Sequence, residues 1–131
     1  MSVGDSATAL GKVRGLGSAG EGGEHWLAEK VAALALVLLS AWLIASLLFL
    51  PSLDQRTLAE WLSMPSGAVP MALFVITAFY HALHGMKVVV DDYVDDAANN
   101  FAVNTLLLFA AVGGAALALF ALAKIAFGGD A

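Results

Sequence analysis

The chain has 131 residues, of which 60% are hydrophobic and 13% are charged, and its mean hydropathy is +0.84. An average soluble domain carries about twice that share of charged residues, and a chain of this length cannot bury so much apolar surface in water. The formal net charge is −5, whereas a nucleic-acid-binding surface needs clustered cations. Composition therefore excludes a soluble enzyme, a nucleic-acid-binding protein and a disordered linker, and it indicates a small integral membrane protein.

Residues 1–24 form a polar, Gly-rich segment that we expect to lie in the cytoplasm. This segment lacks the basic start and apolar stretch of a cleavable secretory signal. Residues 25–131 are predicted to form one membrane-anchor domain. Because the chain has no cysteine, a disulfide, an iron–sulfur cluster and a thiolate metal site are excluded, and a metal would be bound through histidine or carboxylate.

Three uncharged runs are each long enough for the roughly 20 residues that a helix needs to cross a membrane. They are Val31–Leu53, Gly67–Met86 and Phe101–Ala123. Leucine and alanine dominate them, without the alternation of a barrel strand. We therefore predict an all-α fold with three transmembrane helices. Their expected positions are about 27–50, 67–90 and 101–126. The small residues Gly113–Ala116 in the third run favour close helix packing.

Two polar connections separate these runs. Residues 54–66 are predicted to form a short helix at the membrane surface, where tryptophan is favoured. The apolar residues of this helix fall on one side: Leu58, Trp61 and Leu62. The second connection, Asp91–Asn100, is predicted to be a polar turn in which Asn99 or Asn100 caps the third helix.

Lysine and arginine predict the orientation of the chain, because cations favour the cytoplasmic side of a membrane. Four cations fall on one side of the predicted topology: Lys12, Arg14, Lys30 and Lys87. Arg56 and Lys124 fall on the other. We therefore expect a multi-pass membrane protein with the N-terminus in the cytoplasm and the C-terminus on the opposite side of the membrane.

The second predicted helix carries His81 and His84. A titratable residue within a membrane span costs free energy and indicates a functional site by default. His81 lies about 9 Å along the helix from Lys87, within the membrane. The alternative for either histidine is a polar contact with a neighbouring helix. For His84 no role is assigned beyond such a contact or contact with the edge of a cofactor.

An axial histidine in a helical bundle favours a b-type haem, whose flat apolar faces pack between helices. The second ring nitrogen of His81 is expected to donate to the carbonyl of Thr77, one turn earlier, and so fix the tautomer. Gly85, one turn later, leaves room for the macrocycle. The other two predicted spans contain no histidine, so the second axial ligand must come from a partner chain. The sequence thus predicts half of a two-subunit haem-binding helical bundle.

His25 and Lys30 flank the cytoplasmic start of the first predicted span. A haem held at His81 would point its propionates toward this surface, where an imidazole and a cation would pair with them. The alternative is that Lys30 is a membrane anchor with its charge in the headgroup region, and that His25 is an ordinary interfacial residue.

The segment His81-Ala-Leu-His-Gly-Met-Lys-Val-Val-Val-Asp-Asp-Tyr93-Val resembles the second helix of the small membrane-anchor subunit of succinate dehydrogenase (complex II, SdhD type). That family shows His-x-x-x-Gly followed by Asp-Tyr-Val at the helix end. The upstream block Gly15-Leu-Gly-Ser-Ala-Gly, His25-Trp and Lys30 resembles the alphaproteobacterial form. The chain differs from that form in having Lys30 where the family commonly has arginine, and lysine lacks the bidentate fork of arginine.

The resemblance implies roles for individual residues. His81 falls on the axial haem ligand, and His25 and Lys30 fall on haem-propionate contacts. Tyr93 falls on the tyrosine that donates a hydrogen bond to a quinone carbonyl, and Asp92 falls on its acidic neighbour.

The resemblance also implies partners. These are a second haem-ligating membrane anchor (SdhC type), an iron–sulfur subunit and a flavoprotein subunit that oxidises succinate, with ubiquinone as the electron acceptor. The chain itself would perform no dicarboxylate chemistry. Two alternatives stay open: an anchor subunit of a fumarate reductase, and a non-redox scaffold or transport subunit whose two span histidines relay protons.

Overall fold

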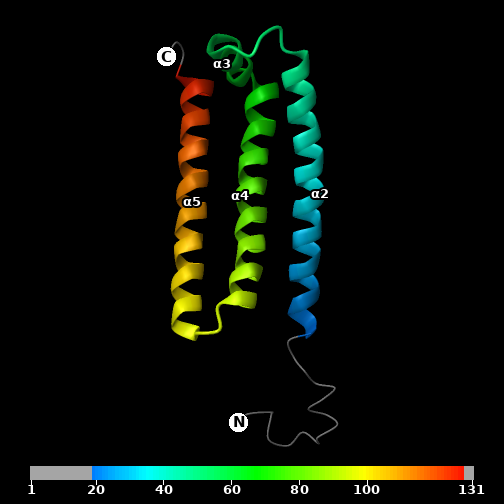
Figure 1. Ribbon diagram of the computed structural model, residues 1–131. Helices are drawn as coiled ribbons and strands as arrows, with labels where there is room; N and C mark the ends of the chain where they lie inside the picture. The colour runs from blue at the N-terminus through cyan, green and yellow to red at the C-terminus, as the bar shows by residue number, and fades with distance from the viewer. Residues whose placement is uncertain (1–18, 129–131) are drawn as a thin grey trace, which may run out of the picture.

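The computed structural model describes residues 19–128, and in this part of the chain it contains four helices and no strand. They are α2 (Ala19–Phe49), α3 (Gln55–Ser63), α4 (Pro65–Tyr93) and α5 (Ala97–Phe127). The three long helices run side by side, with α4 between α2 and α5 and antiparallel to both, and the short helix α3 lies across one end (Figure 1). The predicted all-α fold with three membrane-spanning helices is therefore confirmed.

All three long helices are long and apolar enough to cross a membrane: Gly23–Phe49, Pro65–Tyr93 and Ala97–Phe127. They extend past the predicted spans because hydropathy marks only the part of a helix that lies in hydrocarbon. A helix of 31 residues, such as α2, is about 46 Å long, whereas the hydrocarbon core is about 30 Å thick. Residues 1–18 of the predicted polar segment lie outside the described residues, and the remainder of that segment belongs to α2.

The predicted cap of the third helix is wrong. The helix begins at Ala97, because the Asp96 carboxylate accepts a hydrogen bond from the Asn99 backbone N–H at 2.9 Å. A short acidic side chain next to the free N–H groups of a first turn is the more effective cap. The polar turn is correspondingly shorter than predicted. It covers residues 94–96, since α4 continues to Tyr93.

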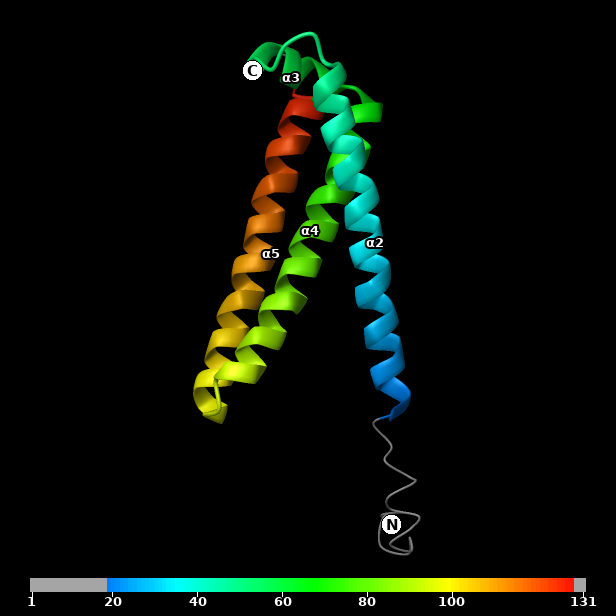
Figure 2. The same cartoon turned by 45° about the vertical axis from the view of Figure 1, so that its right-hand side comes forward.

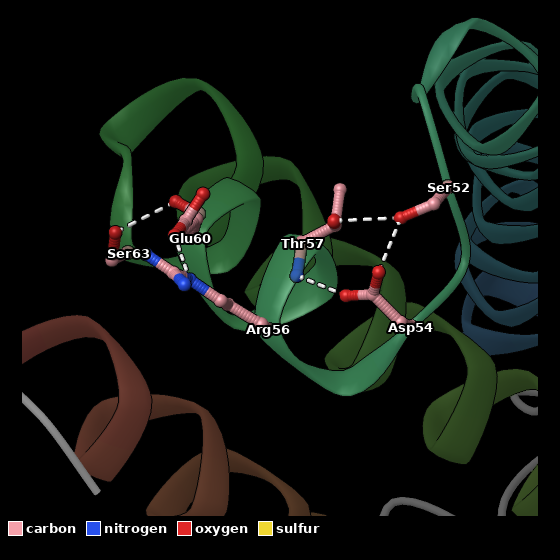
Figure 3. Close-up of polar contacts among 6 residues, drawn as sticks. All are labelled: Ser52, Asp54, Arg56, Thr57, Glu60 and Ser63. Atoms are coloured by element: carbon pink, nitrogen blue, oxygen red, sulfur yellow. Dashed lines mark hydrogen bonds and ion pairs between the residues drawn. The ribbon is translucent and has the colours of Figure 1, made fainter.

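Helix α3 is the predicted surface helix, and it is held by a polar cap (Figure 3). Asp54 accepts hydrogen bonds from the Ser52 hydroxyl at 2.6 Å and from the Thr57 backbone N–H at 2.8 Å. These bonds, the first more than the second, hold the pKa of the Asp54 carboxyl below its usual value. The cap is therefore fully ionised at neutral pH, and it is lost only when the pH falls through this lowered pKa. Arg56 and Glu60 form an ion pair on the solvent side.

The apolar side of α3 packs back onto the bundle, as predicted for Leu58, Trp61 and Leu62, which are all half-buried. The Trp61 ring stacks on Trp42 of α2 with 5.6 Å between ring centroids. Gly67, in the first turn of α4, lies directly against the Trp61 carbonyl, so that a Cβ at this position would collide with it. The contact between Gly67 and Trp61 therefore sets how closely the end of α3 packs against the start of α4.

Close packing within the bundle is also seen at Gly114 in α5, where a Cβ would lie 2.6 Å from the Phe79 ring of α4. This contact confirms that the small residues of the third span let two helices approach each other. Almost no large apolar side chain is fully buried, however. In the described part of the chain the buried hydrophobic residues are Val90 and Leu122. The remaining apolar surface requires lipid or another protein against it.

We expect Gly67→Ala to lower the thermal stability of the assembled protein, and by more than Gly114→Ala. The Trp61 carbonyl belongs to the backbone and cannot yield without moving α3, whereas the Phe79 ring can shift. Such overpacking costs about 1–3 kcal/mol. Gly23→Ala is the matched control, because a Cβ there meets nothing within 4 Å. The melting temperatures of the three purified variants test the ranking, and equal values for Gly67→Ala and Gly23→Ala would contradict it.

Candidate functional site

His81 lies in the middle part of α4, with its side chain exposed toward α2. It borders a groove of about 500 Å³ whose other lining residues all come from α2. Those residues are Ala33, Leu36, Val37, Ser40, Ala41 and Ile44. A titratable ring therefore faces an almost entirely apolar surface within a membrane span, where its placement costs free energy unless a ligand or partner binds it.

The surroundings of His81 fit a flat apolar group with an axial nitrogen ligand. At Gly85, one turn further along α4, a Cβ would meet nothing within 4 Å, so the helix surface beside the imidazole is open. The expected hydrogen bond from His81 to the Thr77 carbonyl is not formed. In the described part of the chain His81 has no hydrogen-bond partner, which leaves both ring nitrogens free.

The kind of hydrogen bond predicted for His81, from a ring nitrogen to the backbone carbonyl four residues earlier, is formed by His84 instead. The Nδ1 of His84 lies 2.8 Å from the Tyr80 carbonyl oxygen, and because a carbonyl only accepts, Nδ1–H donates. The half-buried His84 ring also packs on the Tyr80 ring, with 4.1 Å between centroids, and faces His25 of α2 at 6.3 Å. For His84 only a contact with a neighbouring helix or with the edge of a cofactor was expected, although its spacing of four residues from Tyr80 permits this bond.

Lys30 and His25 point to different neighbours. Lys30 Nζ lies 5.7 Å from the centroid of the Trp26 ring, a cation–π arrangement. Five residues separate Lys30 from His25, which puts their side chains about 140° apart around the helix. The structure therefore brings His25 to His84, and it leaves Lys30 at the exposed surface of α2 beside Trp26.

Tyr93 is the last residue of α4, and its side chain is 82% exposed. Asp92 beside it is also exposed, and neither side chain has a hydrogen-bond partner among residues 19–128. Figure 1 places this end of α4 next to the start of α5. The phenol and the carboxylate thus stand at the end of a membrane-spanning helix, open to a ligand or to a partner chain.

A polar network that the sequence analysis missed fixes this end of α4. Asp91 accepts hydrogen bonds from the side-chain amides of Asn100 at 3.1 Å and Asn104 at 3.0 Å. The Asn104 amide also donates to Asn100 Oδ1 at 2.8 Å. The network lines a polar groove of about 680 Å³ between α4 and α5 that also includes Lys87. Asn100 therefore joins two helices instead of capping one, and the network holds the turn from which Tyr93 projects.

Among the side chains that the structure describes, residues 23–128, no three metal-binding groups lie together.

Comparison with known proteins assigns the family. Residues 5–123 match the family described as succinate dehydrogenase/fumarate reductase transmembrane subunit. The chain belongs to this family. It is 37% identical over 90 residues to the succinate dehydrogenase hydrophobic membrane anchor subunit of Rickettsia bellii, covering 69% of this chain and 72% of the relative. It is 33% identical over 114 residues to the subunit of the same name from Paracoccus denitrificans, covering 87% and 88%.

These relatives confirm the resemblance seen in the sequence and place the chain among SdhD-type anchor subunits. No solved structure gives a significant match to the chain. Membership in a family of transmembrane subunits, together with three helices of spanning length, makes the chain a multi-pass membrane protein.

Proposed function

We propose that the chain anchors a succinate:ubiquinone oxidoreductase in the bacterial inner membrane and supplies one axial ligand of a b-type haem through His81. The observation that carries the haem assignment is the exposed His81 imidazole over the apolar groove between α2 and α4. A second membrane anchor of the SdhC type would cover this face and supply the second ligand. Gly85 leaves the adjacent surface open to the macrocycle.

The bound haem would supply a one-electron carrier within the membrane. His81 would hold the iron, and the apolar lining of α2 would exclude water from the ring face. His25 and Lys30 are the proposed contacts to the propionates. In this role the Lys30 ammonium would either move away from the Trp26 ring or attract the propionate from its position beside that ring. It would act as a point charge, because lysine cannot form two parallel hydrogen bonds to one carboxylate.

Tyr93 and Asp92 are proposed to bind ubiquinone at the end of α4. The Tyr93 hydroxyl would donate a hydrogen bond to a quinone carbonyl oxygen, which becomes more basic as the ring accepts electrons and is then protonated to give the quinol. Donors aimed at such a developing charge accelerate a reaction more than they strengthen ground-state binding. Asp92, one residue earlier, would hold or relay a proton at the same surface.

The soluble subunits would dock at this end of the bundle, because the electrons from succinate must reach Tyr93. A flavoprotein would oxidise succinate, and an iron–sulfur subunit would pass the electrons on, so that this chain performs no dicarboxylate chemistry. Lys30 and Lys87 lie toward this end, whereas Arg56 and Lys124 lie toward the other. With this distribution the N-terminus would be cytoplasmic and the C-terminus periplasmic.

The experiment that tests this function is purification of the complex through an affinity tag on this chain. The proposal predicts co-purification of three further subunits, a b-type band in the reduced-minus-oxidised spectrum, and succinate-dependent ubiquinone reduction. Absence of the haem band would contradict the role of His81. Faster fumarate reduction by a quinol would favour the fumarate reductase alternative, which the family description includes. The relatives are named for succinate dehydrogenase and favour the first reading.

A further inference from the structure

Among the described histidines, His84 is the one whose ring is held by a hydrogen bond. It belongs neither to the proposed iron ligand nor to the proposed quinone site. Its Nδ1–H is held by the Tyr80 carbonyl, and its ring packs between Tyr80 and His25. A half-buried ring fixed in this way loses little conformational entropy when a ligand binds to its remaining nitrogen, Nε2. The site is therefore preorganised for one further partner.

The location of this ring relates it to His81. His84 lies three residues further along α4, which places it about 4.5 Å closer to the end that carries Lys87 and about 60° around the helix axis. Figure 2 shows α2 leaning away from α4 toward the N-terminal end of α2. The His25 and His84 rings, one from each of these helices, lie with their centroids 6.3 Å apart. Both rings thus stand beyond the apolar groove at the end from which a polar group would enter.

Among residues 23–128, no acidic side chain forms an ion pair with His25 or His84. Of the charged residues on the neighbouring stretches of the two helices, Glu24 and Glu29 belong to α2 and Lys87 belongs to α4. Among the described residues neither glutamate forms an ion pair with His25 or His84, and the ion pair found is Arg56–Glu60. Within residues 23–128 these two adjacent imidazoles therefore have no carboxylate partner, and a carboxylate is the group that pairs best with a charged imidazole.

We propose that His84, together with His25, binds a propionate carboxylate of the haem whose iron is held by His81. This inference rests on the proposed haem function and adds His84 to the binding site. A ligand with an apolar body and carboxylates at one edge matches an apolar groove that ends in two imidazoles. The carboxylate binds Nε2 of the His84 imidazolium, while Nδ1–H keeps its bond to Tyr80. Both ring nitrogens then donate, and no buried donor is left unpaired.

The test compares wild-type complex, His84→Leu and His84→Gln by the rate at which haem passes to an excess of apomyoglobin. Loss of a charge-assisted hydrogen bond predicts haem loss at least about tenfold faster in His84→Leu. The absorption band of a haem with two axial histidines should keep its shape. The haem midpoint potential should fall, because an uncompensated propionate disfavours the reduced iron. Glutamine, which can donate to the carboxylate but carries no charge, should slow haem loss again without restoring the midpoint potential.

Three results would overturn the inference. Equal rates of haem loss and equal potentials in wild type and His84→Leu would show that His84 does not bind the haem. Loss of the axial-ligand spectrum in His84→Leu would make His84 an iron ligand. A wild-type complex without haem would instead remove the proposed function itself. Should His84→Leu fail to assemble, His25→Leu carries the same test, with the same faster haem loss expected and an unchanged rate contradicting the proposal.

Discussion

Replacing His81 by leucine is expected to abolish the b-type haem band of the purified complex. Of the three histidines in the chain, His81 is the one that faces the apolar groove, and the described parts of α5 contain no histidine that could replace it. Leucine fills the same space without a nitrogen, so the proposed haem iron would lose one of its two axial bonds. The measurement is the reduced-minus-oxidised spectrum at equal protein concentration.

His84→Leu is the matched control, because it removes an imidazole one turn away on the same helix. The control should keep the shape of the haem band even if the haem exchanges faster. Succinate oxidation by a dye that takes electrons from the soluble subunits reports whether each variant still assembles. An assembled His81→Leu complex with an unchanged haem spectrum would refute the ligand assignment.

Tyr93→Phe is expected to slow ubiquinone reduction by about tenfold or more, since it removes one hydrogen-bond donor from the charge that develops on the quinone. Phenylalanine keeps the ring and deletes only the hydroxyl. Succinate oxidation measured with the same dye should not change, because those electrons never reach the end of α4. The two assays on one preparation separate a quinone defect from an assembly defect.

Tyr80→Phe serves as the control for this change, since Tyr80 is the other tyrosine of the chain and also belongs to α4. Its ring packs on His84 through atoms that phenylalanine retains, and its side chain is 38% exposed against 82% for Tyr93. We expect quinone reduction at close to the wild-type rate in Tyr80→Phe. A parallel loss of quinone and dye activity in Tyr93→Phe, or no loss in either, would contradict the quinone site.

The fold of this protein follows from its sequence more directly than the fold of a soluble domain would. In lipid the backbone must satisfy its own hydrogen bonds, so each long uncharged run has to be a helix, and the three runs allow little else. The ends of the helices are harder to predict, because they depend on local polar contacts outside the hydrocarbon. The capping of α5 by Asp96, where a neighbouring asparagine was expected, is such a contact.

The candidate site was only partly predictable. Hydropathy and residue type bring out His81, because an imidazole is unusual within a membrane span, whereas Tyr93 was found through the family resemblance. The partners of His84 and Asp91 depend on how the helices face each other. His84 meets His25 from another helix, and Asp91 meets Asn100 and Asn104. The rotation of each helix about its axis, which decides these contacts, is not encoded in any short motif of one sequence.

The most direct measurement of the central claim is an electron cryomicroscopy structure of the complete complex, purified through this chain. The account predicts a porphyrin in the groove between α2 and α4, with its iron bonded to the His81 imidazole on one face and to a histidine of the second membrane anchor on the other. Density in which His81 contacts only lipid or protein, with no porphyrin beside it, would contradict the account.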